Sequence, residues 1–204
     1  MSKRQMWNDR YADKDLVWSG GPNELFAKEV KNLRPGKALD VACGEGRNAI
    51  WLAEQGWDVT AIDFSDVAIE KGRQIAARRE VNVNWIAEDV SSWQLPRHEF
   101  DLVAVLYLHT TIDEREQWLE NVISSVKPSG TFIYIAHDID NIKNGVGGPQ
   151  DPALLPTVAE ITSALKGFSI ENAGVIERPV ARDPGHGKEL EGIALDSFVR
   201  AVRT

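Results

Sequence analysis

The residues with the clearest chemical meaning are two closely spaced glycines, Gly44 and Gly46, in the segment ALDVACGEGRNA over 38–49. They stand between an apolar run and a segment of helical period, so they are expected in a strand-to-helix turn. Together with Ala49 they satisfy the G-x-G-x-x-G/A pattern. Glycine allows a positive φ and lets a ligand approach the backbone, where a side chain would fill the ligand's place. The turn is predicted to bind a nucleotide-like ligand, and tight packing alone is the alternative.

Three acidic residues lie in or directly after the first three predicted strands, and open α/β sheets bind ligands at the carboxyl ends of such strands. Asp63 follows the second strand, where its carboxylate can accept from both ribose hydroxyls of either NAD or S-adenosylmethionine. Asp89 follows the third strand and can accept from an adenine amino group while the Val90 amide donates to a ring nitrogen, which favours an adenosyl ligand. Asp40 either orients loop amides or a ligand amino group, or has a purely structural role.

Histidines are the candidates for chemistry on a second substrate. His109 ends the predicted fourth strand and is expected to act as a base or a substrate contact, with packing at a strand end as the alternative. His137 and Asp138 follow the fifth strand and would extend the same pocket. His186, on a loop flanked by Gly and Pro, is a second catalytic candidate, and an ordinary surface histidine is the alternative. The four histidines are scattered and no cluster has metal-ligand spacing, so no metal site is predicted.

The elements that must position these residues alternate between apolar runs and segments of helical period from residue 37 onward, which predicts an α/β fold. Two β-rich segments at the end predict an antiparallel pair. The expected fold is a Rossmann-like, doubly wound sheet of seven strands, mostly parallel, with helices on both faces. Asp113 with Glu116, and Thr157 with Glu160, predict helix capping boxes. The predicted strands cover 37–42, 58–62, 83–88, 101–107, 131–136, 168–180 and 192–203, and the predicted helices cover 46–55, 66–79, 114–126 and 158–166.

Composition restricts the partners of the chain. Its 204 residues fit one domain, and a net charge of -8 at pH 7 disfavours phosphate backbones and anionic lipid headgroups. Neither nucleic acid nor a membrane is expected as partner. The single cysteine, Cys43, excludes an internal disulfide and fits a reducing cytoplasm. The N-terminus lacks the apolar core of a signal peptide, and the longest apolar run, 102–108, is too short to span a bilayer.

Five motifs, ALDVACGEGRN, AIDFS, AEDV, FDLVAVLYLH and VKPSG, follow one another along the chain. Together they resemble the class I S-adenosylmethionine-dependent methyltransferases over roughly residues 36–137. The resemblance implies S-adenosyl-L-methionine as cofactor and S-adenosyl-L-homocysteine as its product. It implies a cofactor site made by the acid before the glycine loop, the loop, and the acids after strands two and three. The expected cofactor contacts there are Asp40, Ala42, Cys43, Gly44, Gly46, Asn48, Asp63, Phe64, Ser65, Asp89, Val90 and Leu106.

The N-terminal segment WNDRYADKDLVWSGGPNELF, residues 7–26, resembles the tellurite-resistance and thiopurine methyltransferase-like branch of these enzymes. In that branch the segment folds over the cofactor, which implies that Arg10, Tyr11 and Trp18 lie near its methionyl end. Aromatic faces stabilise a sulfonium cation, and an arginine can pair with the methionyl carboxylate. Packing of Trp7 and Tyr11 along an amphipathic helix is the alternative. We expect a helical cap or lid over 1–36, a cofactor-binding core over 37–137, and a substrate side over 138–204, in one domain.

The methyl acceptor is expected to be a small molecule. Enzymes that methylate exocyclic or amide nitrogens carry an Asn/Asp-Pro-Pro-aromatic motif after strand four, where this chain has Leu106-Tyr107-Leu108-His109. Cytosine C5 methylation needs a nucleophilic thiol in its own loop, whereas Cys43 lies in the glycine loop. We expect in-line transfer to a thiol, oxyanion, metalloid, halide or phenol, by a monomer or homodimer. An NAD(P)-dependent oxidoreductase and a non-catalytic adenosyl-ligand-binding domain remain alternatives.

Overall fold

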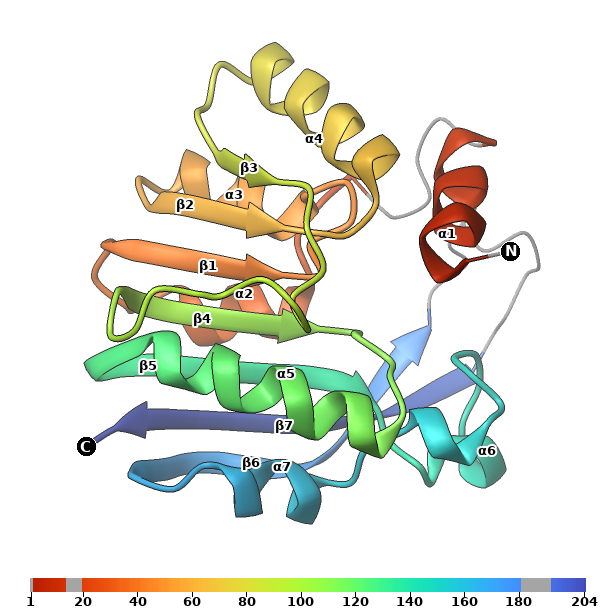
Figure 1. Cartoon of the computed structure of the whole chain (residues 1–204). Coiled ribbons are helices and arrows are strands. Elements are labelled where there is room, and N and C mark those ends of the chain that lie inside the picture. The colour runs from red at the N-terminus through yellow and green to blue at the C-terminus, as the bar shows by residue number, and fades with distance from the viewer. Residues whose placement is uncertain (1, 14–19, 181–191) are drawn as a thin grey trace.

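The apolar runs of the sequence form one mixed sheet in the computed structural model, which describes residues 2–13, 20–180 and 192–204. The strand order is β3-β2-β1-β4-β5-β7-β6. The first five strands are parallel, and β7 runs antiparallel to both β5 and β6 (Figure 1). The predicted Rossmann-like sheet with its antiparallel C-terminal pair is therefore confirmed. The strands are β1 (Lys37–Val41), β2 (Asp58–Ile62), β3 (Asn84–Ile86), β4 (Phe100–Leu106), β5 (Val126–His137), β6 (Phe168–Val180) and β7 (Gly192–Arg203).

Helices cover both faces of the sheet because the central strands are apolar on both sides. On one face α2, α3 and α4 pack through a cluster that includes Phe26, Ile50 and Ile69. On the other face α5 and α7 pack through a cluster that includes Trp118 and Ile161. The helices are α1 (Lys3–Ala12), α2 (Glu24–Val30), α3 (Arg47–Glu54), α4 (Asp66–Arg78), α5 (Ile112–Ser125), α6 (Asn141–Asn144) and α7 (Val158–Ala164), with a 3-10 turn η1 (Pro152–Leu154).

Two strands, β5 and β3, differ from the prediction by more than one residue. β5 begins at Val126 instead of residue 131, and its pairing with β4 is irregular at this end. A left-handed φ of 64° at Ser129 turns the chain within this stretch, which hides the strand from a search for alternating residues. β3 retains only Asn84–Ile86 of the predicted 83–88, since it is an edge strand paired with β2 alone.

The start of α5 also differs from the prediction. The helix begins at Ile112, and Thr111 is its N-cap. The Thr111 amide donates to the Glu114 carboxylate at 3.1 Å, which closes a capping box two residues earlier than predicted. The predicted box of Asp113 with Glu116 is therefore wrong, because both residues already lie inside the helix.

The segment predicted as a loop over 138–156 contains two short helical turns, α6 and η1. At the following helix, α7, Thr157 is the N-cap, as predicted. The Thr157 hydroxyl accepts from the Glu160 amide at 3.2 Å, which is one of the two hydrogen bonds of the predicted capping box.

The N-terminal residues divide into two parts with different surroundings. α2 belongs to the core, since Phe26 and Val30 are buried in the cluster with α3 and α4. α1 lies beyond the carboxyl ends of the parallel strands and contacts α4 (Figure 1). Across the described ranges, no helix has the length and apolar character needed to cross a bilayer.

Candidate functional site

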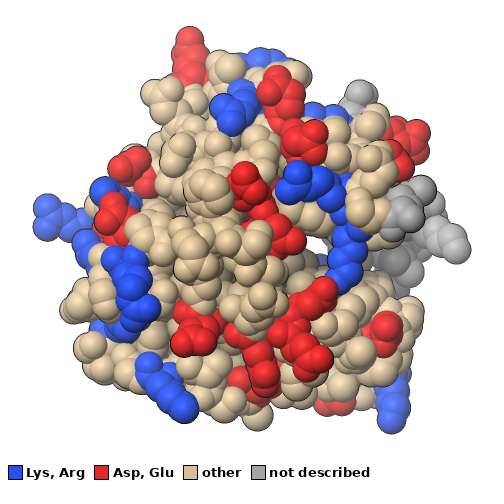
Figure 2. All heavy atoms as spheres, in the orientation of Figure 1, with Lys and Arg blue, Asp and Glu red and all other residues tan. Residues whose placement is uncertain are grey.

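The carboxyl ends of the parallel strands are the edge where open α/β sheets bind ligands, at the point where the strand order reverses. In this sheet the reversal lies between β1 and β4, because β2 and β3 follow on one side and β5 on the other. α1 and α6 both lie beyond this edge (Figure 1). Figure 2 shows the surface hollowed between α1 and the strand ends, with acidic and basic side chains beside the opening. This edge is the candidate site.

The glycine turn joins β1 to α3 and has a positive φ at every second residue. The angle φ is 54° at Ala42, 56° at Gly44 and 77° at Gly46. A Cβ on Gly46 would lie 2.2 Å from the ring of Trp85 on β3. At Gly46, packing against a side chain therefore accounts for the glycine, whereas Gly44 is a buried turn residue that faces the end of β2.

Asp63, directly after β2, ties the glycine turn to the turn that begins α4. Its Oδ2 accepts from the Gly44 amide at 2.9 Å, and its Oδ1 accepts from the Ser65 amide at 2.8 Å. The side chain is 5% exposed, and this burial raises the pKa of Asp63 while the two amide hydrogen bonds oppose the rise. A carboxylate has about four lone-pair positions, so acceptor capacity remains for the hydroxyls of a ligand.

Asp40 stabilises the first turn of α3 from within β1. Its Oδ2 accepts from the Ala49 amide at 3.0 Å. Burial raises the pKa of Asp40 to about 7, opposed by the Ala49 hydrogen bond and by the charge of Arg47. Of the roles expected for this residue, the structure shows the one that orients a backbone amide.

The predicted adenine contacts lie at the end of β3. Asp89 is exposed, and its Oδ1 accepts from the Ser91 amide at 2.9 Å, so the carboxylate is positioned by the local turn. Val90 is buried in the cluster under α5. Phe64 is half-buried beside the Asp63 turn, and Leu106 is buried at the end of β4. Contacts of these residues with a cofactor stay predictions.

Three further predicted contacts are engaged within the protein. Cys43 is buried, and burial raises the pKa of its thiol, so it is a neutral packing residue. The Asn48 side chain accepts from the Asn23 amide at 2.9 Å, which joins α3 to the start of α2. The Ser65 hydroxyl accepts from the Ala68 amide at 3.1 Å and caps α4. These bonds rigidify the turns around the glycines.

α1 is held at this edge by one asparagine and two aromatic rings. The Ser65 hydroxyl donates to Asn8 Oδ1 at 2.6 Å, and Asn8 Nδ2 donates to Asp66 Oδ1 at 2.8 Å. The rings of Trp7 and Tyr11 are 5.7 Å apart, and Tyr11 is buried in a small cluster with α4. Sequence reasoning missed Asn8, which bridges α1 to the residues that follow Asp63.

The predicted methionyl contacts are only partly described. Tyr11 is buried against α4, which is the packing alternative foreseen for it. The Arg10 guanidinium carbon lies 4.9 Å from the centre of the Trp7 ring, so this arginine makes a cation–π contact on α1. Trp18 and His186 lie outside the described residues, and their roles stay predictions.

A second polar group of side chains lies where β4 and β5 end and where β6 and β7 pass them. It consists of Tyr107, His109, His137, Arg178 and Asp196, and we call it the His–Arg cluster. The Tyr107 hydroxyl donates to Asp196 Oδ2 at 2.7 Å, and Arg178 Nε donates to the same oxygen at 2.6 Å. His137 Nδ1 lies 3.3 Å from His109 Nε2, and His137 Nε2 lies 3.5 Å from Arg178 Nη2.

Burial governs the electrostatics of the His–Arg cluster. It lowers the pKa of His109 to about 3, with a smaller effect of the same sign from His137. Burial also raises the pKa of Tyr107, and the carboxylate of Asp196 adds to the rise. Tyr107 has a left-handed φ of 56°, an unfavourable conformation for a bulky residue, and its amide donates to the Ile135 carbonyl at 2.7 Å.

Sequence reasoning placed His109 and His137 at this position but missed Tyr107, Arg178 and Asp196 as partners. Arg178 and Asp196 stand in the two terminal strands, where only alternation was visible. A signal existed in Asp196, because a carboxylate in the middle of an apolar interior strand needs a charged or hydrogen-bonded partner.

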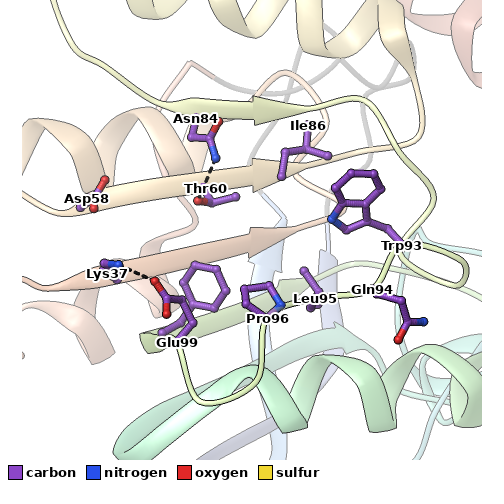
Figure 3. Close-up of a pocket in the computed structure, with 11 residues that line it drawn as sticks. Lys37, Asp58, Thr60, Asn84, Ile86, Trp93, Gln94, Leu95, Pro96 and Glu99 are labelled. Atoms are coloured by element: carbon purple, nitrogen blue, oxygen red, sulfur yellow. Dashed lines mark hydrogen bonds and ion pairs between the residues drawn. The ribbon is translucent and has the colours of Figure 1, made fainter.

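A separate cavity of about 420 Å³ lies toward the opposite edge of the sheet. Its lining includes Lys37, Asp58 and Asn84, which are the first residues of β1, β2 and β3 (Figure 3). The Lys37 ammonium pairs with Glu99, and Asn84 Nδ2 donates to Thr60 at 3.4 Å. The cavity is thus remote from the glycine turn and is not the candidate site.

No group of three or more possible metal ligands occurs within the part of the chain that the structure describes. The site is therefore built from a glycine turn, buried carboxylates and the His–Arg cluster. A doubly wound sheet with these features at its carboxyl edge defines a Rossmann-like ligand-binding domain.

Comparison with known proteins narrows this class, since residues 38–130 match the family model of a methyltransferase domain. A 2-heptyl-1-hydroxyquinolin-4(1H)-one methyltransferase of Mycobacteroides abscessus is 27% identical over 151 residues, which are 72% of this chain and 66% of that protein. Thiocyanate methyltransferase 1 of Arabidopsis thaliana is 25% identical over 193 residues, which are 91% of this chain and 82% of that protein. The first match thus spans just under two thirds of the relative's length.

Among solved structures, a magnesium protoporphyrin IX methyltransferase of Synechocystis with bound SAH has a TM-score of 0.68 at 19% identity and covers 98% of each chain, which shows the shared fold. The family match spans just under half of the chain, so over residues 38–130 the protein is similar to methyltransferase domains. The Synechocystis structure contains bound SAH, which agrees with the cofactor that the sequence resemblance implies.

Proposed function

We propose that this protein transfers the methyl group of S-adenosylmethionine to a small-molecule acceptor. The observation that carries the proposal is the clamp made by Asp63, which holds the Gly44 and Ser65 amides at 2.9 and 2.8 Å and keeps acceptor capacity at the carboxyl edge. This clamp lies within the segment that matches a methyltransferase domain. A ribose diol donates two hydrogen bonds, which fits a buried carboxylate with lone pairs to spare.

Different residues of the chain would then bind different parts of the cofactor. Asp63 holds the ribose, Asp89 and Val90 hold the adenine, and the backbone of the glycine turn contacts the methionyl part. When bound, the cofactor supplies an electrophilic methyl group on a sulfonium. α1, fastened by Asn8, excludes water from this edge, and positioning in a water-poor site is the main source of acceleration for such a displacement.

The acceptor side is the His–Arg cluster, which lies next to the reversal of strand order. We propose that it receives a small thiol, oxyanion, metalloid, halide or phenol. Relatives named for a hydroxyquinolone and for thiocyanate support a small acceptor. Acidic side chains gather on the face that carries α5 (Figure 2), which supports an acceptor other than nucleic acid. Membership of the tellurite-resistance and thiopurine branch, a cytoplasmic location and a monomeric or dimeric state belong to the same proposal.

Calorimetry with S-adenosylmethionine, S-adenosylhomocysteine and NAD tests the cofactor part of this function. We expect both adenosyl ligands to bind and NAD to give no heat. Transfer of an isotope-labelled methyl group to a panel of thiols, phenols, halides and thiocyanate then tests the reaction. Binding of NAD alone would favour an oxidoreductase, and adenosyl binding without turnover of any acceptor would favour a non-catalytic domain.

A further inference from the structure

In the His–Arg cluster, Arg178 determines which nitrogen of each histidine donates and which accepts a hydrogen bond. A guanidinium can only donate. Because Arg178 Nη2 lies 3.5 Å from His137 Nε2, this nitrogen accepts, and the proton of a neutral His137 is on Nδ1. His137 Nδ1 lies 3.3 Å from His109 Nε2, so it donates there. The proton of a neutral His109 is then on its Nδ1.

This order of donors leaves His109 unsuited to be a base. Its Nε2 lone pair already accepts from His137. The pKa of His109 falls to about 3, chiefly through burial and then through His137, with Asp196 on β7 raising it and Arg115 on α5 lowering it. At neutral pH His109 is therefore an uncharged ring with one N–H left to offer.

The Asp196 carboxylate of the cluster is also fully engaged in hydrogen bonds within the protein. Asp196 is 1% exposed, and its Oδ2 accepts from both the Tyr107 hydroxyl and Arg178 Nε. The ion pair fixes the guanidinium over the Tyr107 ring, with its carbon 5.4 Å from the ring centre. The Arg178 side chain is still 32% exposed, so a solute can reach it. The cluster thus presents a cation and an N–H donor.

Resting on the methyl transfer proposed above, we propose that the His–Arg cluster is the acceptor subsite and takes an acceptor that arrives ionised, such as a small thiolate or comparable anion. Arg178 attracts the anion, and the His109 N–H orients it. The anion's lone pair forms the new bond to the methyl carbon, the carbon–sulfur bond breaks, and its electron pair stays on sulfur. No proton moves, so the reaction requires no base. Asp196 and His137 are positioning residues, since they act through Arg178 and His109.

Two acceptors of one shape test the requirement for an ionised acceptor. Thiophenol ionises readily near neutral pH, whereas phenol remains protonated. We expect methylation of thiophenol with a kcat/KM that rises with pH as the thiol ionises, and phenol turnover at least about a hundredfold slower. Preference for phenol, or turnover of neither by a protein that binds S-adenosylmethionine, would overturn the subsite. Failure of the wild type to bind S-adenosylmethionine would instead sink the proposed function.

Variants at His109 separate a donor from a base. His109→Gln keeps an N–H donor, whereas His109→Leu removes it. We expect His109→Gln to lose a few-fold and His109→Leu about tenfold or more in kcat/KM for thiophenol, as for a lost hydrogen bond to a charged group. Equal losses in both variants would contradict a donor role, because a base is lost equally in each. Calorimetry and thermal melting of each variant are the controls for cofactor binding and for folding.

Variants at Arg178 test the attraction of an anion. We expect Arg178→Gln to raise the KM for thiophenol about tenfold or more, to change kcat less, and to leave the affinity for S-adenosylmethionine at the wild-type value. Arg203→Gln is the matched control. Arg203 is the last residue of β7, away from the His–Arg cluster, and it donates to the Ile123 carbonyl at 2.8 Å. An unchanged KM in a folded Arg178→Gln protein would refute the proposal.

Discussion

The carboxylate of Asp63 holds the amide of Gly44 at 2.9 Å, so the end of β2 fixes the conformation of the turn that follows β1. Two neighbouring parallel strands are thus joined at their carboxyl ends by a side chain. The same carboxylate holds the Ser65 amide at 2.8 Å, which extends the connection to the start of α4. One side chain thus connects the glycine turn to the start of α4, the helix that α1 contacts.

Asp63→Asn is expected to weaken binding of S-adenosylmethionine about tenfold or more, because an amide replaces a charged acceptor and brings N–H groups toward backbone donors. Asp58→Asn, at the exposed opposite end of the same strand, is the control and should bind as the wild type does. Calorimetry measures both. An unchanged affinity in a folded Asp63→Asn protein would place the ribose elsewhere.

The buried carboxyl group of Asp40 predicts a pH dependence of stability. Its pKa rises from 3.8 to about 7 on folding, so the folded state binds the proton more tightly. The stabilisation is present below about pH 4 and is lost as pH rises to about 7, a change of at most about 4 kcal/mol. The free energy of unfolding of Asp40→Asn, compared with the wild type in urea across this range, should lack that decline. Parallel pH profiles would contradict the assignment.

Gly46→Ala is expected to destabilise the protein by about 2 kcal/mol or more, because its φ is 77° and a Cβ would lie 2.2 Å from the Trp85 ring. Gly56→Ala is the control, with a φ of 87° and no atom within 4 Å of its Cβ, so it carries the backbone strain alone. Urea unfolding compares them. Equal losses of stability in the two variants would show that the Trp85 ring moves aside without a cost in free energy.

Deletion of residues 1–22 is expected to leave a cooperatively folding core but to abolish methyl transfer and weaken cofactor binding. All the strands that the structure describes, and α2, lie outside the deleted segment. Trp7 and Tyr11 belong to a small cluster with α4, apart from the two clusters that cover the sheet. Thermal melting and a transfer assay measure the two effects. Full activity would show that α1 is no lid, and loss of the cooperative melt would show that it is core.

The sequence was most informative where local patterns and strand order agree. The terminal strands lie at 168–180 and 192–203, as alternation predicted, and the glycine turn joins a strand to a helix. The capping box of α5 was misplaced because Thr111 with Glu114 and Asp113 with Glu116 show the same pattern two residues apart. Local sequence alone cannot choose between them.

The partners of His109 and His137 in the His–Arg cluster were missed because their contacts depend on the order of strands in space. Tyr107 and Asp196 meet only because β7 lies beside β5, and Arg178 reaches them only because β6 pairs with β7. Alternation shows which residues face the same side of one strand, and it contains no information on neighbours across a sheet. The glycine turn, in contrast, is continuous in sequence.

The place of β7 between β5 and β6 has a consequence for synthesis of the protein. β7 follows all other strands in the chain, yet it occupies an interior position in the sheet. Since domains begin to form as the chain is made, the parallel strands with their glycine turn can assemble while β6 still lacks its partner. The growing polypeptide can therefore form the glycine turn before Asp196 emerges to complete the His–Arg cluster.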